Sequence, residues 1–314
     1  MIDFSYMQSG LAALSRSHRA GGMAGHLGGA LLAGYFFSEL RAELDPGVYL
    51  GIERDLERVM RGEEDFWFDQ KKKGITIPEL FAPLSKGGAV KKSAKSEVGA
   101  SLRHSIAKTR QSGHNVIFGS LGIRALDSHP ELATSEVADG LVKLLATFTS
   151  VGPGKGYYGA GAGWKQGDFA EGGAHDYDSM EAMAEATLDY LIDHAHEHRQ
   201  GFGGPFHLID HAAGLLDLSQ CGIHDLAEEG LPAHRHHLEL LKQLPVLDEE
   251  LGALKKSQAT PFDPAYWAKR KSVQWSADLT HRIKVLYGYE IVKSAVDDVE
   301  KCRAADLAFP YLMA

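Results

Sequence analysis

The sequence lacks the features that mark secreted and membrane-spanning proteins. Its two cysteines, Cys221 and Cys302, are far apart, so neither a disulfide framework nor a Cys-x-x-Cys metal pair is expected. The apolar run at 27–37 is much shorter than the roughly 20 residues of a membrane-spanning helix. It also begins too late for a secretory signal, so we predict a cytoplasmic protein.

Positive charge is scarce as well. With 33 Lys and Arg against 42 Asp and Glu, the formal net charge is −9. Nucleic acids and anionic membranes bind cationic surfaces. We therefore expect neither as a partner and predict a small-molecule substrate instead, while the sequence does not specify an oligomeric state.

Segments that alternate apolar and polar residues are rare, whereas apolar residues at helical spacing recur along the chain. The pattern predicts one all-α domain over residues 1–314. The expected helices are a hairpin at 114–127 and 134–148, followed by 179–198, 206–218, 232–243 and 280–303. Two irregular segments interrupt them, a Lys-rich connection at 83–97 and a Gly-rich, aromatic loop at 151–178.

Four of the predicted helices share a pattern. Each begins near a histidine, continues with apolar residues and carries a glycine seven or eight positions after that histidine. The four histidines are His26, His114, His207 and His281. A helix that is apolar on all sides is buried. The repeat predicts helical hairpins whose inner helices meet, at their N-terminal ends, around one pocket capped by the 151–178 loop.

This repeat resembles the (α/α) toroids, which include terpenoid cyclases, lanthionine cyclases and polysaccharide lyases. The resemblance implies an (α/α) toroid or an incomplete helical barrel. The cysteine-containing zinc motifs of lanthionine cyclases and the aspartate-rich motifs of terpenoid cyclases are absent, since Asp297 and Asp298 fall late in the last predicted helix. The segment 199–211 also resembles part of an uncharacterised bacterial family, and this second resemblance implies no activity.

His207 and His211 are four residues apart, on one face of a predicted helix, as metal-binding histidine pairs are. Three interpretations of the pair stay open: ligands of a divalent metal such as zinc, substrate-binding or acid–base groups, and hydrogen-bonded core residues. The glutamate that follows the first histidine of a zincin motif is missing.

His114 and Asn115 are adjacent at a predicted helix start. Toroidal polysaccharide lyases use Asn, His and Tyr for β-elimination, and the resemblance to them makes Tyr157 or Tyr158 the candidate acid. The alternative for His114 and Asn115 is a capping pair. Tyr158 and Trp164 are candidates for stacking on a sugar or an apolar ring, or they belong to a loop that covers the core.

The remaining chemistry-bearing segments give weaker signals. Gly152 to Gly156 contains a lysine but lacks the Gly-Lys-Ser/Thr end of a phosphate loop, so no nucleotide cofactor is predicted. Six histidines fall in polar helical runs and are expected to face solvent. They are His194, His196, His198, His234, His236 and His237.

These patterns lead to one functional hypothesis and one competitor. We predict an enzyme with His-based acid–base chemistry, of the lyase, hydrolase or isomerase class, acting on a small polar organic or carbohydrate substrate. The predicted catalytic residues are His114, His207, His211 and Tyr157. The predicted substrate-binding residues are His26, Asn115, Tyr158, Trp164 and His281. The competing hypothesis is a non-catalytic helical ligand-binding or scaffold protein.

Overall fold

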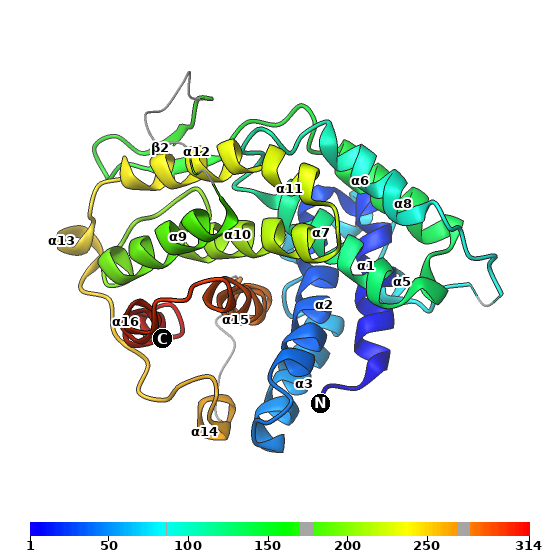
Figure 1. Cartoon of the computed structure of the whole chain (residues 1–314), viewed down its shortest axis with the longest axis horizontal. Coiled ribbons are helices and arrows are strands. Elements are labelled where there is room, and N and C mark those ends of the chain that lie inside the picture. Colours follow the sequence, from blue (N-terminus) through cyan, green and yellow to red (C-terminus); the bar gives the residue numbers. More distant parts are fainter. Residues whose placement is uncertain (86, 170–176, 178, 269–276) are drawn as a thin grey trace.

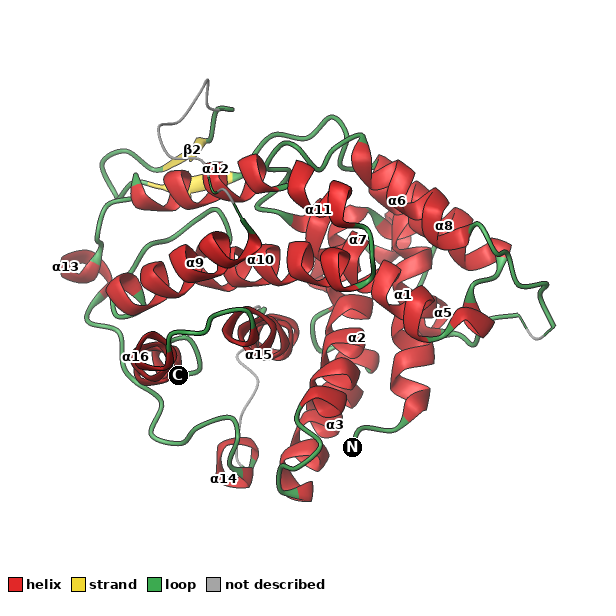
Figure 2. Ribbon diagram, viewed as in Figure 1, coloured by secondary structure: helices red, strands yellow, loops and turns green. Residues whose placement is uncertain are grey.

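The structure is a computed structural model that describes residues 1–85, 87–169, 177, 179–268 and 277–314. These residues are mostly helical, as the apolar periodicity predicts (Figure 1, Figure 2). The α-helices are α1 (Phe4–Ala20), α2 (Gly25–Leu40), α3 (Pro46–Met60), α4 (Gln70–Lys73), α5 (Ile77–Phe81), α6 (Ala94–Arg103), α7 (His114–Ser128), α8 (Ser135–Ala146), α9 (Met180–His194), α10 (Gly204–Gln220), α11 (His224–Glu229), α12 (Leu231–Lys242), α13 (Asp248–Leu251), α14 (Pro264–Trp267), α15 (Asp278–Ser294) and α16 (Val299–Ala308). The strands β1 (Lys155–Tyr157) and β2 (Trp164–Gln166) form an antiparallel pair.

Four helices, α2, α7, α10 and α15, form the centre of the molecule. Helix α2 contacts α7 and α15, and α10 contacts the same two helices. In Figure 1, α2 stands upright, α10 lies horizontally and α15 is seen almost end-on, so the axes of these helices point in very different directions. They are the four helices that share the histidine pattern, and their N-terminal ends meet. The complete ring of hairpins implied by the toroid resemblance stays a prediction.

Close packing explains why α2 is apolar on every side. Residues 25–38 are all buried. A Cβ atom at Gly28 would lie 2.5 Å from the backbone nitrogen of Leu14 and 2.6 Å from the carbonyl oxygen of Gly10. A helical glycine costs about 1 kcal/mol relative to alanine. Here the glycine allows the backbones of α1 and α2 to approach each other closely.

Most predicted helices are present, with one clear exception. The predicted hairpin corresponds to α7 and α8, and the next three predicted helices correspond to α9, α10 and α12. The segment 280–303 was predicted as one helix, which is wrong, because α15 ends at Ser294 and α16 begins at Val299. The carboxylate of Asp298 accepts hydrogen bonds from the backbone N–H groups of Glu300 and Lys301, so it caps a new helix.

Large apolar side chains of the central helices fill the core. Phe36 of α2, Phe118 of α7 and Tyr289 of α15 are all fully buried. Among the helices of the described ranges, none is both long and apolar enough to cross a membrane. The Lys-rich connection at 83–97 includes the start of α6, and its residue 86 lies outside the described residues.

Candidate metal centre

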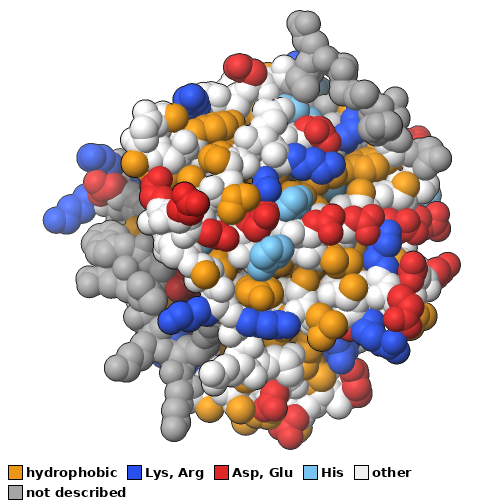
Figure 3. All heavy atoms as spheres, turned by 90° about the vertical axis from the view of Figure 1, so that its left-hand side faces the viewer, with side chains coloured by type: hydrophobic (Ala, Val, Ile, Leu, Met, Phe, Trp, Pro, Cys, Tyr) orange, Lys and Arg blue, Asp and Glu red, His pale blue; other side chains and the backbone are white. Residues whose placement is uncertain are grey.

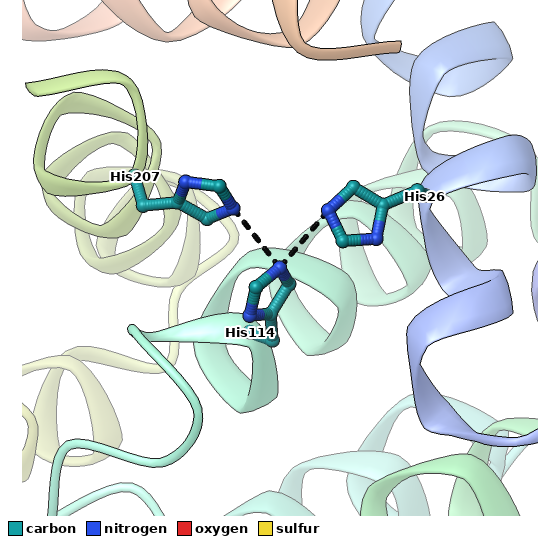
Figure 4. A group of neighbouring side chains, drawn as sticks. All are labelled: His26, His114 and His207. Atoms are coloured by element: carbon teal, nitrogen blue, oxygen red, sulfur yellow. Dashed lines mark hydrogen bonds between the residues drawn. The ribbon is translucent and has the colours of Figure 1, made fainter. Parts of the chain in front are cut away.

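Four histidines meet where α2, α7, α10 and α15 begin. Nε2 of His114 lies 3.0 Å from Nε2 of His26 and 3.0 Å from Nε2 of His207 (Figure 4). Nε2 of His281 lies 3.3 Å from Nε2 of His207. One ring nitrogen from each of His26, His114 and His207 lies within 4.8 Å of the other two, so these three residues could hold a metal ion. We call the four residues the histidine tetrad.

The other ring nitrogen of each tetrad residue faces a backbone carbonyl oxygen one helical turn earlier. Because a carbonyl oxygen only accepts, each Nδ1 carries the proton, and each neutral imidazole presents a lone pair at Nε2. The acceptors are Met23 for His26 (2.8 Å), Gln111 for His114, Gly203 for His207 (2.9 Å) and Ala277 for His281 (2.8 Å). The Nε2 lone pairs therefore face one another, an arrangement that a bound cation stabilises.

Burial keeps the tetrad imidazoles neutral. Loss of hydration lowers the pKa of His26, His207 and His281 well below the usual value, and lowers the pKa of His114 to about 3. The Lys284 ammonium and the neighbouring imidazoles act in the same direction. A proton shared between two Nε2 atoms is therefore disfavoured. Neutral imidazole is the form that binds metals.

The separations between Nε2 atoms suit a first-row transition metal. Such a metal binds imidazole nitrogen at about 2.1 Å. Two ligand nitrogens are then about 3.0 Å apart at a 90° bond angle and about 3.4 Å apart at the tetrahedral angle. The observed separations of 3.0 and 3.3 Å fall within this range. The hydrogen bonds from Nδ1 to carbonyl oxygens are also those that orient metal-binding histidines.

The tetrad lies on the wall of a cavity of about 1020 Å³. Trp67 belongs to the same wall and stacks on His26, with ring centroids 3.8 Å apart. Lys155, Trp164 and Gln166, from the β1–β2 hairpin, line another part. The 151–178 loop thus contributes to the pocket as predicted, although its residues 170–176 and 178 lie outside the described residues.

Two turns with left-handed backbone precede α7 and α10. Gln111, Ser112 and Phe202 have φ values of 45°, 61° and 47°, and no other non-glycine residue of the described ranges has a positive φ. Such conformations cost about 1–3 kcal/mol each and persist only where the surroundings impose them. Here the 151–157 segment imposes them, because Gly152, Pro153 and Lys155 accept hydrogen bonds from the backbone N–H groups of the three strained residues. These turns place the carbonyl groups that orient His114 and His207.

A buried ion pair lies one helical turn deeper than the tetrad. Nζ of Lys284 is 3.3 Å from Oδ2 of Asp210, and both side chains are almost fully buried. Burial lowers the pKa of Lys284 and raises the pKa of Asp210 to about 6. We did not expect this pair from the sequence. Its signal was present, since each residue follows a tetrad histidine by three positions and so shares its helix face.

His211 does not join the tetrad, although it was predicted to act together with His207. Its Nδ1 lies 3.3 Å from Nδ1 of His237, whose Nε2 donates to the carbonyl oxygen of Phe202. The ring of His234 packs edge-on against that of His211, with ring centroids 5.2 Å apart. We call His211, His234 and His237 the second histidine cluster. His234 and His237 were predicted to face solvent, which is wrong, because both are fully buried between α10 and α12.

The other predicted site residues are divided between the cavity and its surroundings. Trp164 lines the cavity. Asn115 is fully buried, and its amide donates to the carbonyl oxygen of Ser105. The Tyr157 hydroxyl donates to Glu250, and Tyr158 packs against a separate apolar cluster around Phe202. Within the described chain, the cavity wall includes neither Asn115 nor either tyrosine.

No protein-family model, curated protein or solved structure matches the chain. The geometry of the side chains is therefore the basis for inferring a function.

Proposed function

We propose that the chain is a metal-dependent enzyme. One divalent first-row transition metal, zinc being the simplest candidate, binds Nε2 of His26, His114 and His207, with His281 beside them. A small polar organic or carbohydrate substrate binds in the cavity. One observation carries the proposal: the buried imidazoles of His26, His114 and His207 and the partly buried imidazole of His281 bring their Nε2 atoms within 3.0–3.3 Å of a neighbouring Nε2. All four Nδ1 protons are donated to backbone carbonyls. Imidazole ligands suit Zn, Cu, Fe and Ni rather than Mg or Ca.

The proposal changes the chemical role of the histidines. As ligands, His114 and His207 hold and orient the ion instead of acting as general bases. A bound ion of this kind supplies Lewis acidity and lowers the pKa of a bound water molecule. Proton transfer then belongs to other titratable groups on the cavity wall, for which Glu197, His198 and Asp278 are the candidates. The reaction class, lyase, hydrolase or isomerase, stays as predicted from the sequence.

A structural zinc site in a non-catalytic protein is the second candidate. The 3.3 Å separation between His207 and His281 favours it, because this distance is close to that between ligands of a tetrahedral zinc ion. Structural zinc sites are closed by four protein ligands, whereas catalytic sites keep a position open. All four tetrad residues line a large cavity, and this favours the enzyme.

Thermal unfolding of chelator-treated protein tests metal binding. Zn²⁺, Co²⁺ or Ni²⁺ at about 100 times Kd should stabilise the folded state by about 2.7 kcal/mol, because the ion binds the assembled tetrad and not the unfolded chain. For a chain of this length, that stabilisation raises Tm by about 4 °C. Mg²⁺ and Ca²⁺ are the matched controls and should leave Tm unchanged, because they prefer oxygen ligands. Equal melting curves with and without every transition metal would contradict the proposal.

A further inference from the structure

We propose that the metal of the histidine tetrad binds the carboxylate of a small organic acid on its cavity side, and that the substrate is therefore a carboxylate anion. This inference rests on the proposed function and names its substrate class. It is carried by the charges around the tetrad, by the arrangement of the four imidazoles and by the cavity wall.

The tetrad supplies no negative charge to a bound cation. Four neutral imidazoles leave both charges of a divalent ion uncompensated. The nearest buried carboxylate on the same helices, Asp210, forms an ion pair with Lys284. Glu64 is also buried, but it accepts hydrogen bonds from the backbone N–H groups of Leu279 and Thr280 and so compensates the positive end of α15. Two more carboxylates, Glu197 and Asp278, belong to the cavity wall and not to the tetrad, and Glu197 pairs with Arg199. A ligand that enters through the cavity can place negative charge on the ion itself.

The other three helices add positive potential at the same place. The N-caps of α2, α7 and α10 are Ala24, Gly113 and Gly203, and none forms a side-chain cap hydrogen bond. Side-chain caps of Asp, Ser or Thr are present on α1, α3, α8, α9 and α16, and are absent also from α6 and α12. Each helix N-terminus carries about half a positive charge. An anion on the metal would compensate the positive charge of both the ion and these helix ends.

The imidazoles leave room for such a ligand. Neighbouring ring centroids around the tetrad are 4.5–4.9 Å apart, while those of His26 and His207, which face each other across it, are 5.9 Å apart. Among the described residues, His26, His114 and His207 form the histidine group whose ring nitrogens all lie within 4.8 Å of one another. A metal ion held by three protein ligands keeps a coordination position open. Since all four residues line the cavity, one open position faces it.

The cavity wall matches an anion with an apolar body. Arg199 and Arg282 line it but form ion pairs with Glu197 and Asp55. The third lining cation, Lys155, has no carboxylate partner among the described side chains. Trp67, Trp164 and Phe206 supply apolar surface. On the molecular face shown in Figure 3, acidic and basic side chains are interspersed, so selection of the anion is local to the cavity.

The test uses the full chain loaded with Co²⁺, whose visible absorption reports on its ligands. Acetate should change the Co²⁺ spectrum with a saturating dependence on concentration, whereas acetamide, its neutral analogue, should not. Lys155→Gln should weaken acetate binding about fivefold, the effect of losing one partly exposed charge. Lys165→Gln removes a neighbouring lysine that does not line the cavity and should bind acetate like the wild type.

The outcomes separate this inference from the proposed function. If Co²⁺ does not bind, the proposed metal centre is wrong. If Co²⁺ binds at one ion per chain but acetate leaves the spectrum unchanged, the metal centre stands and the carboxylate inference is overturned. A response to acetamide equal to that of acetate, or a response to inorganic phosphate alone, also overturns it.

Discussion

His207→Ala is expected to abolish metal binding, whereas His211→Ala is expected to preserve it. The two residues are both buried and one turn apart on α10, so they form a matched pair. Nε2 of His207 belongs to the tetrad, while His211 belongs to the second histidine cluster. Changes in residues that merely support a ligand already cost about 10–100-fold in affinity. Loss of the ligand itself should cost more than about 100-fold, measured by competition with a chelator of known affinity.

Without metal, His211→Ala should destabilise the fold more than His207→Ala does. His207→Ala removes one of four facing lone pairs beside a cavity, and should change the free energy of unfolding by no more than about 1–2 kcal/mol. His211 is fully buried, and Gly113 packs closely against its ring. His211→Ala should therefore cost about 2–4 kcal/mol, as large-to-small core substitutions do. If both variants bound metal like the wild type, or both lost it equally, the assignment of the tetrad would be wrong.

The buried ion pair beneath the tetrad gives the second large effect. Asp210→Asn leaves the Lys284 ammonium buried without its counter-ion, and should destabilise the fold by about 3–5 kcal/mol. The double variant Asp210→Leu/Lys284→Met replaces both charges with apolar groups. It should lie close to the wild type, because removing a buried pair together avoids the unpaired charge. Urea unfolding of the metal-free proteins measures both values.

A surface pair and a pH series provide controls for this experiment. Lys301 pairs with Glu185 on the surface, and Glu185→Gln should cost no more than about 1 kcal/mol.

In Lys284→Met, Asp210 can be neutralised by a proton, because burial raises its pKa, to about 6 in the wild type. The folded state then binds that proton more tightly than the unfolded state, so the stability of this variant should rise as pH falls from 8 to 6. An Asp210→Asn variant as stable as the wild type would contradict the pairing.

The sequence predicted the helices and the convergence of their histidines because both depend on local patterns. An apolar stripe with a histidine at the first turn specifies which helices are buried and which end carries the polar group. The repeat also indicated that His26 and His281 belong with His114 and His207. It predicted the first two as substrate-binding residues and did not indicate that the Nε2 atoms of His26, His114 and His207 come together in one group.

The spacing of His211 alone did not predict which neighbouring helix its side chain faces. Helix α10 is buried on several sides and contacts α7 and α15 as well as α9 and α12. Two residues four positions apart on such a helix can face different neighbours. His234 and His237 show the same limitation on α12. They share the buried face with Leu238 and Leu241, at helical spacing, so a histidine there behaves as a core residue.

The irregular loop was the least predictable part, because its structure depends on long-range pairing. Its segment at 152–157 hydrogen-bonds to backbone groups at 111–112 and 200–202, far away in the sequence. Gly154 and Gly201 adopt positive φ within this pairing. A sequence pattern shows that glycines are numerous, but it does not show which strained turns they support.

The metal content and coordination of the wild-type protein test the central claim most directly. Elemental analysis of the full chain as purified should find one first-row transition-metal ion per chain. X-ray absorption at the edge of that metal should show a first shell of imidazole nitrogens at about 2.0–2.1 Å. A chain that contains no such metal and does not take up Zn²⁺ or Co²⁺, or a metal bound through sulfur or carboxylate oxygen without imidazole, would contradict the claim.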